Sequence, residues 1–239
     1  MPTTADTPKC YAEVHGRRLL DWAIQAFAAA EVHDIAFIGG YQIARVRQDY
    51  PKFTFRHNVD WEHNNILASL MQAEDLMEHG FICCYSDILF TSDVIRGVLA
   101  ARSDIVLSVD TNWLARYQYR TQHPPDDAEK VITRNGCVTR IHRAIAPSEA
   151  SGEYTGIAKF TRVGAAQLRQ HYHEARRNNS GKPFREAPVF EKAYLIHLFQ
   201  EMLELGVKMA HADTPGGYME VDTQQDFELA RKFWPLAGV

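Results

Sequence analysis

Short apolar runs alternate, along the first half of the chain, with longer stretches whose apolar residues recur at helical spacing. This alternation constrains the fold more than any other feature. Residues 34–40, 53–58, 81–86 and 105–110 are runs of strand length. Residues 18–30, 43–50, 66–79 and 92–101 place apolar side chains at i, i+3 and i+4, as amphipathic helices do. Strands alternating with helices favour parallel βαβ units. The first half therefore predicts a doubly wound, mainly parallel sheet flanked by helices.

The second half predicts a more mixed set of elements. Residues 130–134 and 137–142 flank Asn135-Gly136, a pair typical of a tight hairpin turn. We expect further strands at 153–161, 207–212 and 218–222, and helices at 164–176, 189–205 and 224–233. Neither an internal repeat nor a long low-complexity linker divides the chain. The sequence therefore predicts a single α/β domain over residues 1–239.

Composition narrows the class of protein. The chain has 239 residues, and 26 basic against 30 acidic side chains give a net charge of −4. It lacks the basic excess of a nucleic-acid-binding protein. No run approaches the roughly 20 apolar residues of a membrane span, and residues 1–10 lack the apolar core of a signal peptide. The four cysteines form no CxxC pair, which favours reduced thiols. We expect a cytoplasmic protein with no nucleic-acid partner and no membrane span.

Two aspartates stand where α/β proteins place ligand chemistry. Asp87 follows the run 81–86 and Asp222 ends the run 218–222, and open α/β sheets bind ligands at the carboxyl ends of their strands. Carboxylate oxygens suit Mg²⁺. Lys9 follows a proline in a polar loop, where an ammonium group can neutralise phosphate charge. The simpler alternatives are a helix N-cap for Asp222 and a solvated surface position for Lys9.

Seven short motifs occur in a fixed order: 8–10 (PKC), 14–20 (VHGRRLL), 38–41 (IGGY), 64–66 (NNI), 86–90 (SDILF), 153–158 (EYTGIA) and 220–223 (EVDT). In this order and spacing they resemble the nucleotidyltransferases of the sugar-phosphate type. Within that group the chain looks most like the cytidylyltransferases that act on phosphocholine or on phosphonates. The resemblance spans essentially the whole chain. It implies a Rossmann-like nucleotidyltransferase fold, with residues 1–110 as the nucleotide-binding half and 111–239 as the acceptor-binding half.

The resemblance also implies an activity and a set of site residues. The activity is transfer of a nucleotidyl group, CMP from CTP, to a phosphocholine-like or phosphonate acceptor, with release of pyrophosphate. Lys9, Asp87 and Asp222 would be catalytic, and the two aspartates would hold Mg²⁺. The implied nucleotide-binding residues are Lys9, Gly39, Gly40, Tyr41, Asn64 and Asp87. The implied acceptor-binding residues are Asp110, Trp113, Lys130, Glu153, Tyr154, Gly156, Tyr194 and Glu220.

Residue chemistry offers both support and alternatives for these roles. Aromatic rings beside carboxylates, as at Asp110 and Trp113, suit an ammonium group through cation–π and charge attraction. Aromatic residues more commonly pack in cores, Gly39-Gly40-Tyr41 also fits an ordinary βα turn, and Lys130 also fits a surface hairpin. A homodimer stays an open alternative to a monomer.

The chain departs from the family pattern at its start. The family has a first strand and a glycine-rich loop just before the Pro-Lys pair, and Met1 stands where the last residue of that loop would be. We therefore expect a strand to be missing between the strands at 34–40 and 81–86. A start assigned too far downstream, a truncation or a degenerate family member would each give this pattern. The alternative functions are a sugar-1-phosphate nucleotidyltransferase and a non-catalytic nucleotide-binding remnant.

Overall fold

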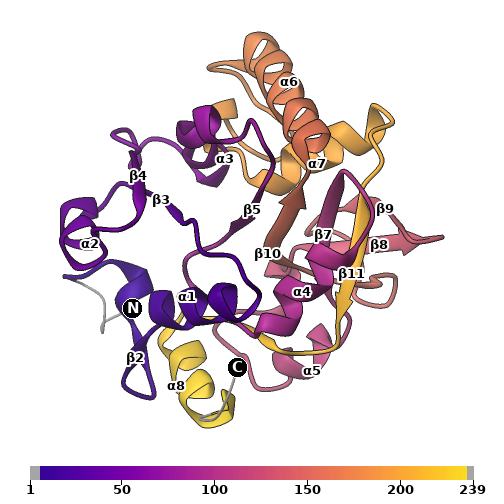
Figure 1. Cartoon of the computed structure of the whole chain (residues 1–239). Coiled ribbons are helices and arrows are strands. Elements are labelled where there is room, and N and C mark those ends of the chain that lie inside the picture. Colours follow the sequence, from indigo (N-terminus) through magenta and orange to yellow (C-terminus); the bar gives the residue numbers. More distant parts are fainter. Residues whose placement is uncertain (1–5, 236–239) are drawn as a thin grey trace.

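A central six-stranded sheet organises the chain (Figure 1), which the computed structural model describes over residues 6–235. The strand order is β5-β10-β7-β11-β9-β8. The strands are β5 (Phe81–Cys84), β7 (Ile105–Asp110), β8 (Lys130–Arg134), β9 (Cys137–Ile141), β10 (Gly152–Phe160) and β11 (Ala210–Thr214). The predicted mixed α/β class is confirmed.

The sheet is mixed, and the expected mainly parallel order is not confirmed. Within it β7 and β11 run parallel, whereas β10 pairs antiparallel with β5, β7 and β8. The additional β10–β8 pairing closes β10, β7, β11, β9 and β8 into a small barrel. The burial of β10 along nearly its whole length does not set the direction of the strand. β10 lies between β5 and β7 and runs antiparallel to both.

Three two-stranded sheets and a set of helices complete the fold. The strand pairs are β1 (Glu13–Val14) with β2 (Arg17–Arg18), β3 (Ala36–Gly39) with β4 (Thr54–His57), and β6 (Ile88–Phe90) with β12 (Tyr218–Glu220). The α-helices are α1 (Leu19–Ala29), α2 (Ile43–Asp49), α3 (Ile66–Leu70), α4 (Ser92–Ala100), α5 (Trp113–Tyr117), α6 (Arg162–Asn179), α7 (Leu195–Glu204) and α8 (Gln224–Phe233). The 3₁₀ turns are η2 (Lys9–Tyr11), η3 (Met71–Leu76), η4 (Pro125–Asp127) and η5 (Phe190–Lys192).

The core lies on both faces of the sheet because successive strand residues point to opposite sides. In β7, Leu107 packs in the cluster that contains α6 and α7, whereas Val106 packs in the cluster that contains α1 and α4. Burial on both faces explains why apolar residues occupy consecutive positions at the start of this strand. The bounds of β7 match the predicted 105–110.

The Asn-Gly hairpin is also confirmed. Asn135 has φ 51° and Gly136 has φ 76°, and positive φ at both central residues is the signature of the turn that suits the twist of paired strands. The helix expected over 66–79 divides into α3 and η3, while β6 and α5 are elements that the sequence did not predict.

A cavity separates β3 from β5. In the described part of the chain β3 pairs only with β4, and β5 pairs only with β10. Figure 1 shows the β3–β4 pair standing apart from β5, and the cavity between them has a volume of about 780 Å³. Its lining includes Phe37, Ile38, Phe81 and Cys83. We call this cavity the slot. The structure thus keeps the gap that the sequence predicts between these two strands.

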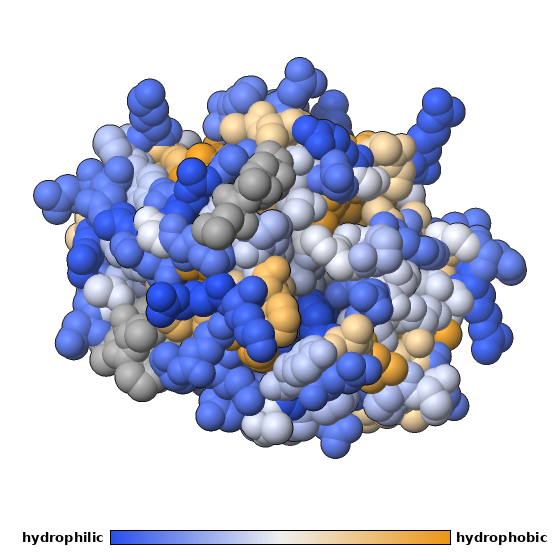
Figure 2. Space-filling model, turned by 90° about the horizontal axis from the view of Figure 1, so that it is seen from below, coloured by the Kyte–Doolittle hydropathy of each residue, from blue (hydrophilic) through white to orange (hydrophobic). Residues whose placement is uncertain are grey.

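The face in Figure 2 is mostly hydrophilic, with apolar residues in small separate groups. Among residues 6–235 no helix is both long enough and apolar enough to cross a bilayer. All four cysteines are free, as the sequence predicts.

Candidate active site

Lys9, Asp87 and Asp222 meet at the carboxyl end of β5. The ammonium group of Lys9 donates a hydrogen bond to Asp87 Oδ2 at 2.8 Å and a second one to Asp222 Oδ1. The backbone brings the aspartates together, because Val221 N donates to Asp87 O at 2.9 Å beside the β6–β12 ladder. The convergence predicted from two strand ends is therefore present. We call these three residues the Lys9 centre.

At the Lys9 centre the effect of neighbouring charges on the pKa values outweighs the effect of burial. Burial alone would lower the pKa of Lys9, but the charges of Asp87 and Asp222 raise it above its usual range. Burial would likewise raise the pKa of Asp222, yet the neighbouring Lys9 ammonium holds it below its usual value. Both groups are therefore charged at neutral pH.

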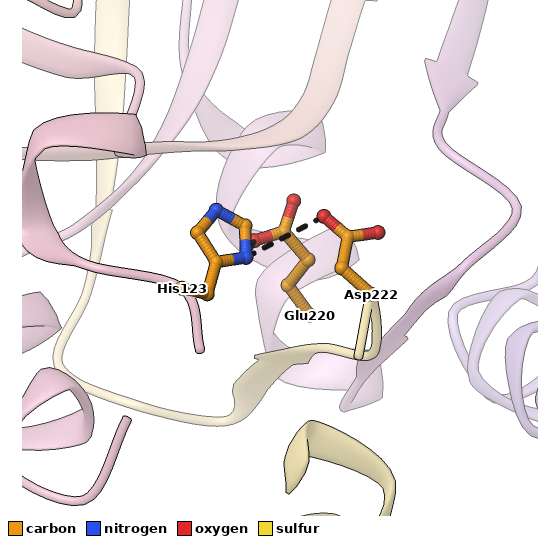
Figure 3. Close-up of side chains that lie close together, drawn as sticks. All are labelled: His123, Glu220 and Asp222. Atoms are coloured by element: carbon orange, nitrogen blue, oxygen red, sulfur yellow. Dashed lines mark ion pairs between the residues drawn. The ribbon is translucent and has the colours of Figure 1, made fainter. Parts of the chain in front are cut away.

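The side-chain atoms of the predicted Mg²⁺ ligands are of the kind that Mg²⁺ prefers. Asp87 and Asp222 already turn carboxylate oxygens toward one cationic group, the Lys9 ammonium, and Mg²⁺ prefers such hard oxygen ligands. A second set, His123, Glu220 and Asp222, also brings ligand atoms within 4.8 Å of one another. Figure 3 shows the His123 ring facing both carboxylates, with Nδ1 3.6 Å from Asp222 Oδ2 and 3.7 Å from Glu220 Oε2. The pair Asp87 and Asp222 fits Mg²⁺ better because it offers oxygen alone.

A pocket of about 380 Å³ opens beside the Lys9 centre. It is lined mainly by acids and tyrosines, and we call it the acidic pocket. Its lining includes Tyr85, Asp87, His123, Glu129, Arg143, Glu153, Tyr154, Tyr194, Tyr218, Glu220 and Asp222. It shares Ile66, Tyr85 and Ser86 with the slot. The volume lies within the range of about 300–1,000 Å³ found for small-molecule sites.

Two arginines neutralise the acids behind the pocket. Arg116 lies 3.0 Å from Asp110 Oδ2 and pairs with Glu153, which also accepts a hydrogen bond of 2.6 Å from Tyr117. The guanidinium of Arg120 pairs with Asp226 at 2.7 Å and lies 3.3 Å from Glu220. These acids already have cationic partners inside the protein.

The predicted acceptor residues divide into two groups. Glu153, Tyr154, Tyr194 and Glu220 line the acidic pocket. The other predicted residues lie outside its lining: Asp110, Trp113, Lys130 and Gly156.

The residues outside the lining have visible structural roles. Trp113 is 2% exposed and packs against Tyr117 and Ala128. Lys130 donates to the backbone oxygens of residues 125, 126 and 128, which uses the three donors of an ammonium group. Lys130 therefore holds the loop before β8 in place.

Gly156 shapes the pocket through the backbone. Its φ is +79°, and a Cβ there would lie 2.5 Å from the Tyr85 ring. Glycine at this irregular point of β10 lets Tyr85 lie against the strand. The effect of Gly156 on the pocket is therefore indirect.

The predicted nucleotide-binding residues other than Lys9 and Asp87 lie at the end of β3 and in the loop before α3. A Cβ on Gly40 would lie 2.2 Å from the Trp61 side chain, so close packing against Trp61 is enough to explain why glycine occupies this position. The Tyr41 ring lies 5.6 Å from the Trp61 ring. Asn64 exchanges two hydrogen bonds of 2.8 Å with Asn58. A role for Gly39, Gly40, Tyr41 and Asn64 toward a nucleotide stays a prediction.

Several pocket residues are not among those predicted from the sequence, above all Tyr85, His123, Glu129 and Arg143. Glu129 directly precedes the strand that begins at Lys130, and strand neighbours point to opposite sides. In the structure the Lys130 side chain points to backbone oxygens, whereas the Glu129 side chain lines the pocket. Arg143 follows the predicted hairpin in an irregular segment, where no periodicity indicates its direction.

In fold and in sequence the chain is similar to nucleotidyltransferases of the sugar-phosphate type. No protein-family model matches the chain. Its structure is similar to that of the CTP:phosphocholine cytidylyltransferase from Streptococcus pneumoniae, with a TM-score of 0.70, 16% identity, and coverage of 98% of this chain and 92% of that one. At this identity the likeness concerns the fold.

Two cytidylyltransferases are similar to this chain in sequence. A CTP:phosphoglutamine cytidylyltransferase of Campylobacter jejuni is 25% identical over 239 residues, which cover 96% of this chain and 93% of that protein. A 2-aminoethylphosphonate cytidylyltransferase of Lancefieldella rimae is 31% identical over 107 residues, 43% of each chain. The resemblance to cytidylyltransferases seen in the sequence motifs is therefore confirmed.

Proposed function

We propose that the protein transfers CMP from CTP to a small acceptor bearing a phosphate or phosphonate group and releases pyrophosphate. The observation that carries this proposal is the Lys9 centre, which lies beside an acidic, tyrosine-lined pocket in a chain related to cytidylyltransferases. The names of both curated relatives specify CTP or cytidylyl transfer, and their acceptors are phosphoglutamine and 2-aminoethylphosphonate.

The reaction is a direct in-line displacement. An oxygen of the acceptor phosphate or phosphonate attacks the α-phosphorus of CTP and forms a new P–O bond. The bond from the α-phosphorus to the bridging oxygen breaks, and its electron pair leaves with pyrophosphate. The attacking oxygen is already anionic at neutral pH, so the protein must mainly position the reactants and offset charge.

The residues of the Lys9 centre suit this task. The ammonium of Lys9 would neutralise charge that develops on the triphosphate. Asp87 and Asp222 would hold Mg²⁺, which supplies positive charge to the phosphates when bound. The acidic pocket would hold the acceptor, with Tyr154, Tyr194 and Glu220 among its walls.

Location and oligomeric state stay predictions. The four free cysteines support the reducing cytoplasm that the sequence predicts. The division into a nucleotide-binding half at 1–110 and an acceptor-binding half at 111–239 likewise stays a prediction, as does a homodimer.

A pyrophosphate-release assay tests the proposed activity. CTP, UTP, ATP and GTP are each combined with phosphocholine, 2-aminoethylphosphonate or glucose 1-phosphate in the presence of Mg²⁺. We expect release with CTP and an amine-bearing acceptor, loss of release in Asp87→Asn, and normal release in the control Asp93→Asn, whose side chain is exposed. Release with glucose 1-phosphate alone would favour the sugar-phosphate alternative. No release above the Asp87→Asn background would contradict the proposal and favour a non-catalytic nucleotide-binding protein.

A further inference from the structure

One corner of the acidic pocket holds a buried carboxylate and an arginine that bind each other. Arg143 donates to Glu129 Oε1 at 3.2 Å, and the Tyr85 hydroxyl donates to Glu129 Oε2, also at 3.2 Å. Glu129 is 7% exposed. The Arg143 side chain is 39% exposed, and its guanidinium stacks 4.3 Å from the centre of the Tyr194 ring. Both charges therefore face a pocket that a small molecule can enter.

The same corner has unused hydrogen-bonding capacity. Arg143 Nε and the Tyr154 hydroxyl are buried atoms without a hydrogen-bond partner among residues 6–235. Tyr154 is 2% exposed and lines the pocket. Buried polar atoms normally have partners. Two unpartnered polar atoms on residues that line the pocket indicate that a polar ligand supplies their missing hydrogen bonds.

Glu153 and Glu220 differ from Glu129 in that their arginine partners are more deeply buried than Arg143. Glu153 is held by Arg116 and Tyr117, and Glu220 lies beside Arg120. Those two arginines are 17% and 5% exposed at the side chain. Burial raises the pKa of Glu129 to about 7 although Arg143 lowers it, so this carboxylate is under-compensated and an additional positive charge would stabilise it.

We infer that this corner binds a zwitterionic head group of the acceptor, with the carboxylate of Glu129 holding an ammonium and the guanidinium of Arg143 holding a carboxylate. The inference rests on the proposed function, which places the phosphate or phosphonate end of the acceptor at the Lys9 centre. A ligand with both charges replaces the internal ion pair without leaving either Glu129 or Arg143 unpaired. A ligand with only an ammonium leaves Arg143 without a carboxylate. The acceptor class is thus a phosphorylated or phosphonate amino acid.

Calorimetric titration tests this inference without requiring turnover. The probes are phosphoserine (ammonium and carboxylate), phosphoethanolamine (ammonium only) and phosphoglycolate (carboxylate only), each with and without CTP. Because one charge-assisted pair separates phosphoserine from the other two, we expect it to bind at least ~10-fold more tightly than either.

Two variants assign the charges to their residues. Arg143→Met should reduce the affinity for phosphoserine to that for phosphoethanolamine. Glu129→Gln should remove the advantage of phosphoserine over phosphoglycolate. The matched controls Arg140→Met and Glu149→Gln change exposed residues nearby and should keep the wild-type preference. Arg143→Lys, which keeps the charge but not the planar fork, covers the case that Arg143→Met fails to fold, and it should weaken phosphoserine binding more than phosphoethanolamine binding.

The outcomes separate this inference from the proposed function. Equal or weaker binding of phosphoserine, or no binding of any probe, overturns the zwitterion site, and so does an unchanged preference in a folded Arg143 variant. Pyrophosphate release with an acceptor that lacks a carboxylate would leave the proposed function intact in each case.

Discussion

Replacing Arg116 by methionine should destabilise the protein strongly, because this side chain neutralises two buried carboxylates. The Asp110 side chain is fully buried and that of Glu153 is 5% exposed. Unit charges 3.0 Å apart, as in the Arg116–Asp110 pair, attract by about 5 kcal/mol at an effective dielectric constant of about 20. The substitution leaves Asp110 with hydrogen bonds from the backbone N–H groups of Asn112 and Gly216.

We therefore expect Arg116→Met to lower the free energy of unfolding by about 3–5 kcal/mol, the usual cost of breaking a buried ion pair from one side. That is a large part of the roughly 5–15 kcal/mol by which domains are stable. Urea unfolding followed by circular dichroism measures the loss. Arg102→Met, at an exposed position, is the matched control and should change stability by less than about 0.5 kcal/mol.

The loss should also depend on pH. Burial raises the pKa of Asp110 even though Arg116 lowers it, so removing Arg116 raises this pKa further. A carboxyl whose folded-state pKa exceeds its unfolded value binds more protons when folded, and stability then falls as pH rises between the two values. The deficit of Arg116→Met should therefore be smaller at about pH 5 than at about pH 8. Adding Asp110→Asn and Glu153→Gln should restore stability. A loss below about 1 kcal/mol, or one independent of pH, would refute the account of Arg116 as the neutralising group.

Three further predictions concern the Lys9 centre and the slot. Lys9→Met should reduce the rate of pyrophosphate release by at least ~100-fold, whereas Lys52→Met at an exposed position should not; equal rates would exclude a catalytic role for Lys9. Mg²⁺ should raise the thermal unfolding midpoint of the wild type, and Asp222→Asn should abolish that rise; a persistent rise would place the ion elsewhere. An N-terminal extension with an apolar strand of valine and isoleucine should fill the slot and raise the midpoint by at least ~2 °C, which corresponds to about 1 kcal/mol at this size. A serine- and lysine-rich extension of equal length is the control, and an equal rise with it would contradict strand insertion.

The sequence predicts elements well where one local rule decides them. The apolar run of β7 and the Asn135-Gly136 turn each depend on a few neighbouring residues. The direction of β10 depends on which strands it joins, and an apolar strand of either direction buries both faces equally well. The parallel sheet expected from the βα alternation fails at this point, because β10 lies between β5 and β7.

The candidate site shows the same contrast between residues that a local rule predicts and residues that only tertiary packing places. Asp87 and Asp222 are found from the rule about strand ends, and the structure brings both to Lys9. Trp113 follows such a strand end as well, yet α5 carries its ring into the core. Arg143 and His123 come from irregular segments whose direction only tertiary packing sets. Sequence could therefore supply the anchor residues of the site but not the partners that complete it.

The charges at the Lys9 centre explain why these anchor residues suit a nucleotide only together with a cation. One ammonium between two carboxylates leaves a net negative charge, and Glu220 lies nearby in the pocket lining. A triphosphate would meet repulsion from this group of side chains. Under the proposed function, Asp87 and Asp222 would hold a divalent cation whose charge would offset theirs, and the Lys9 ammonium would then be available to the phosphates. The pairing of Lys9 with both aspartates therefore supports the proposal that this centre binds a cation and a polyanion together.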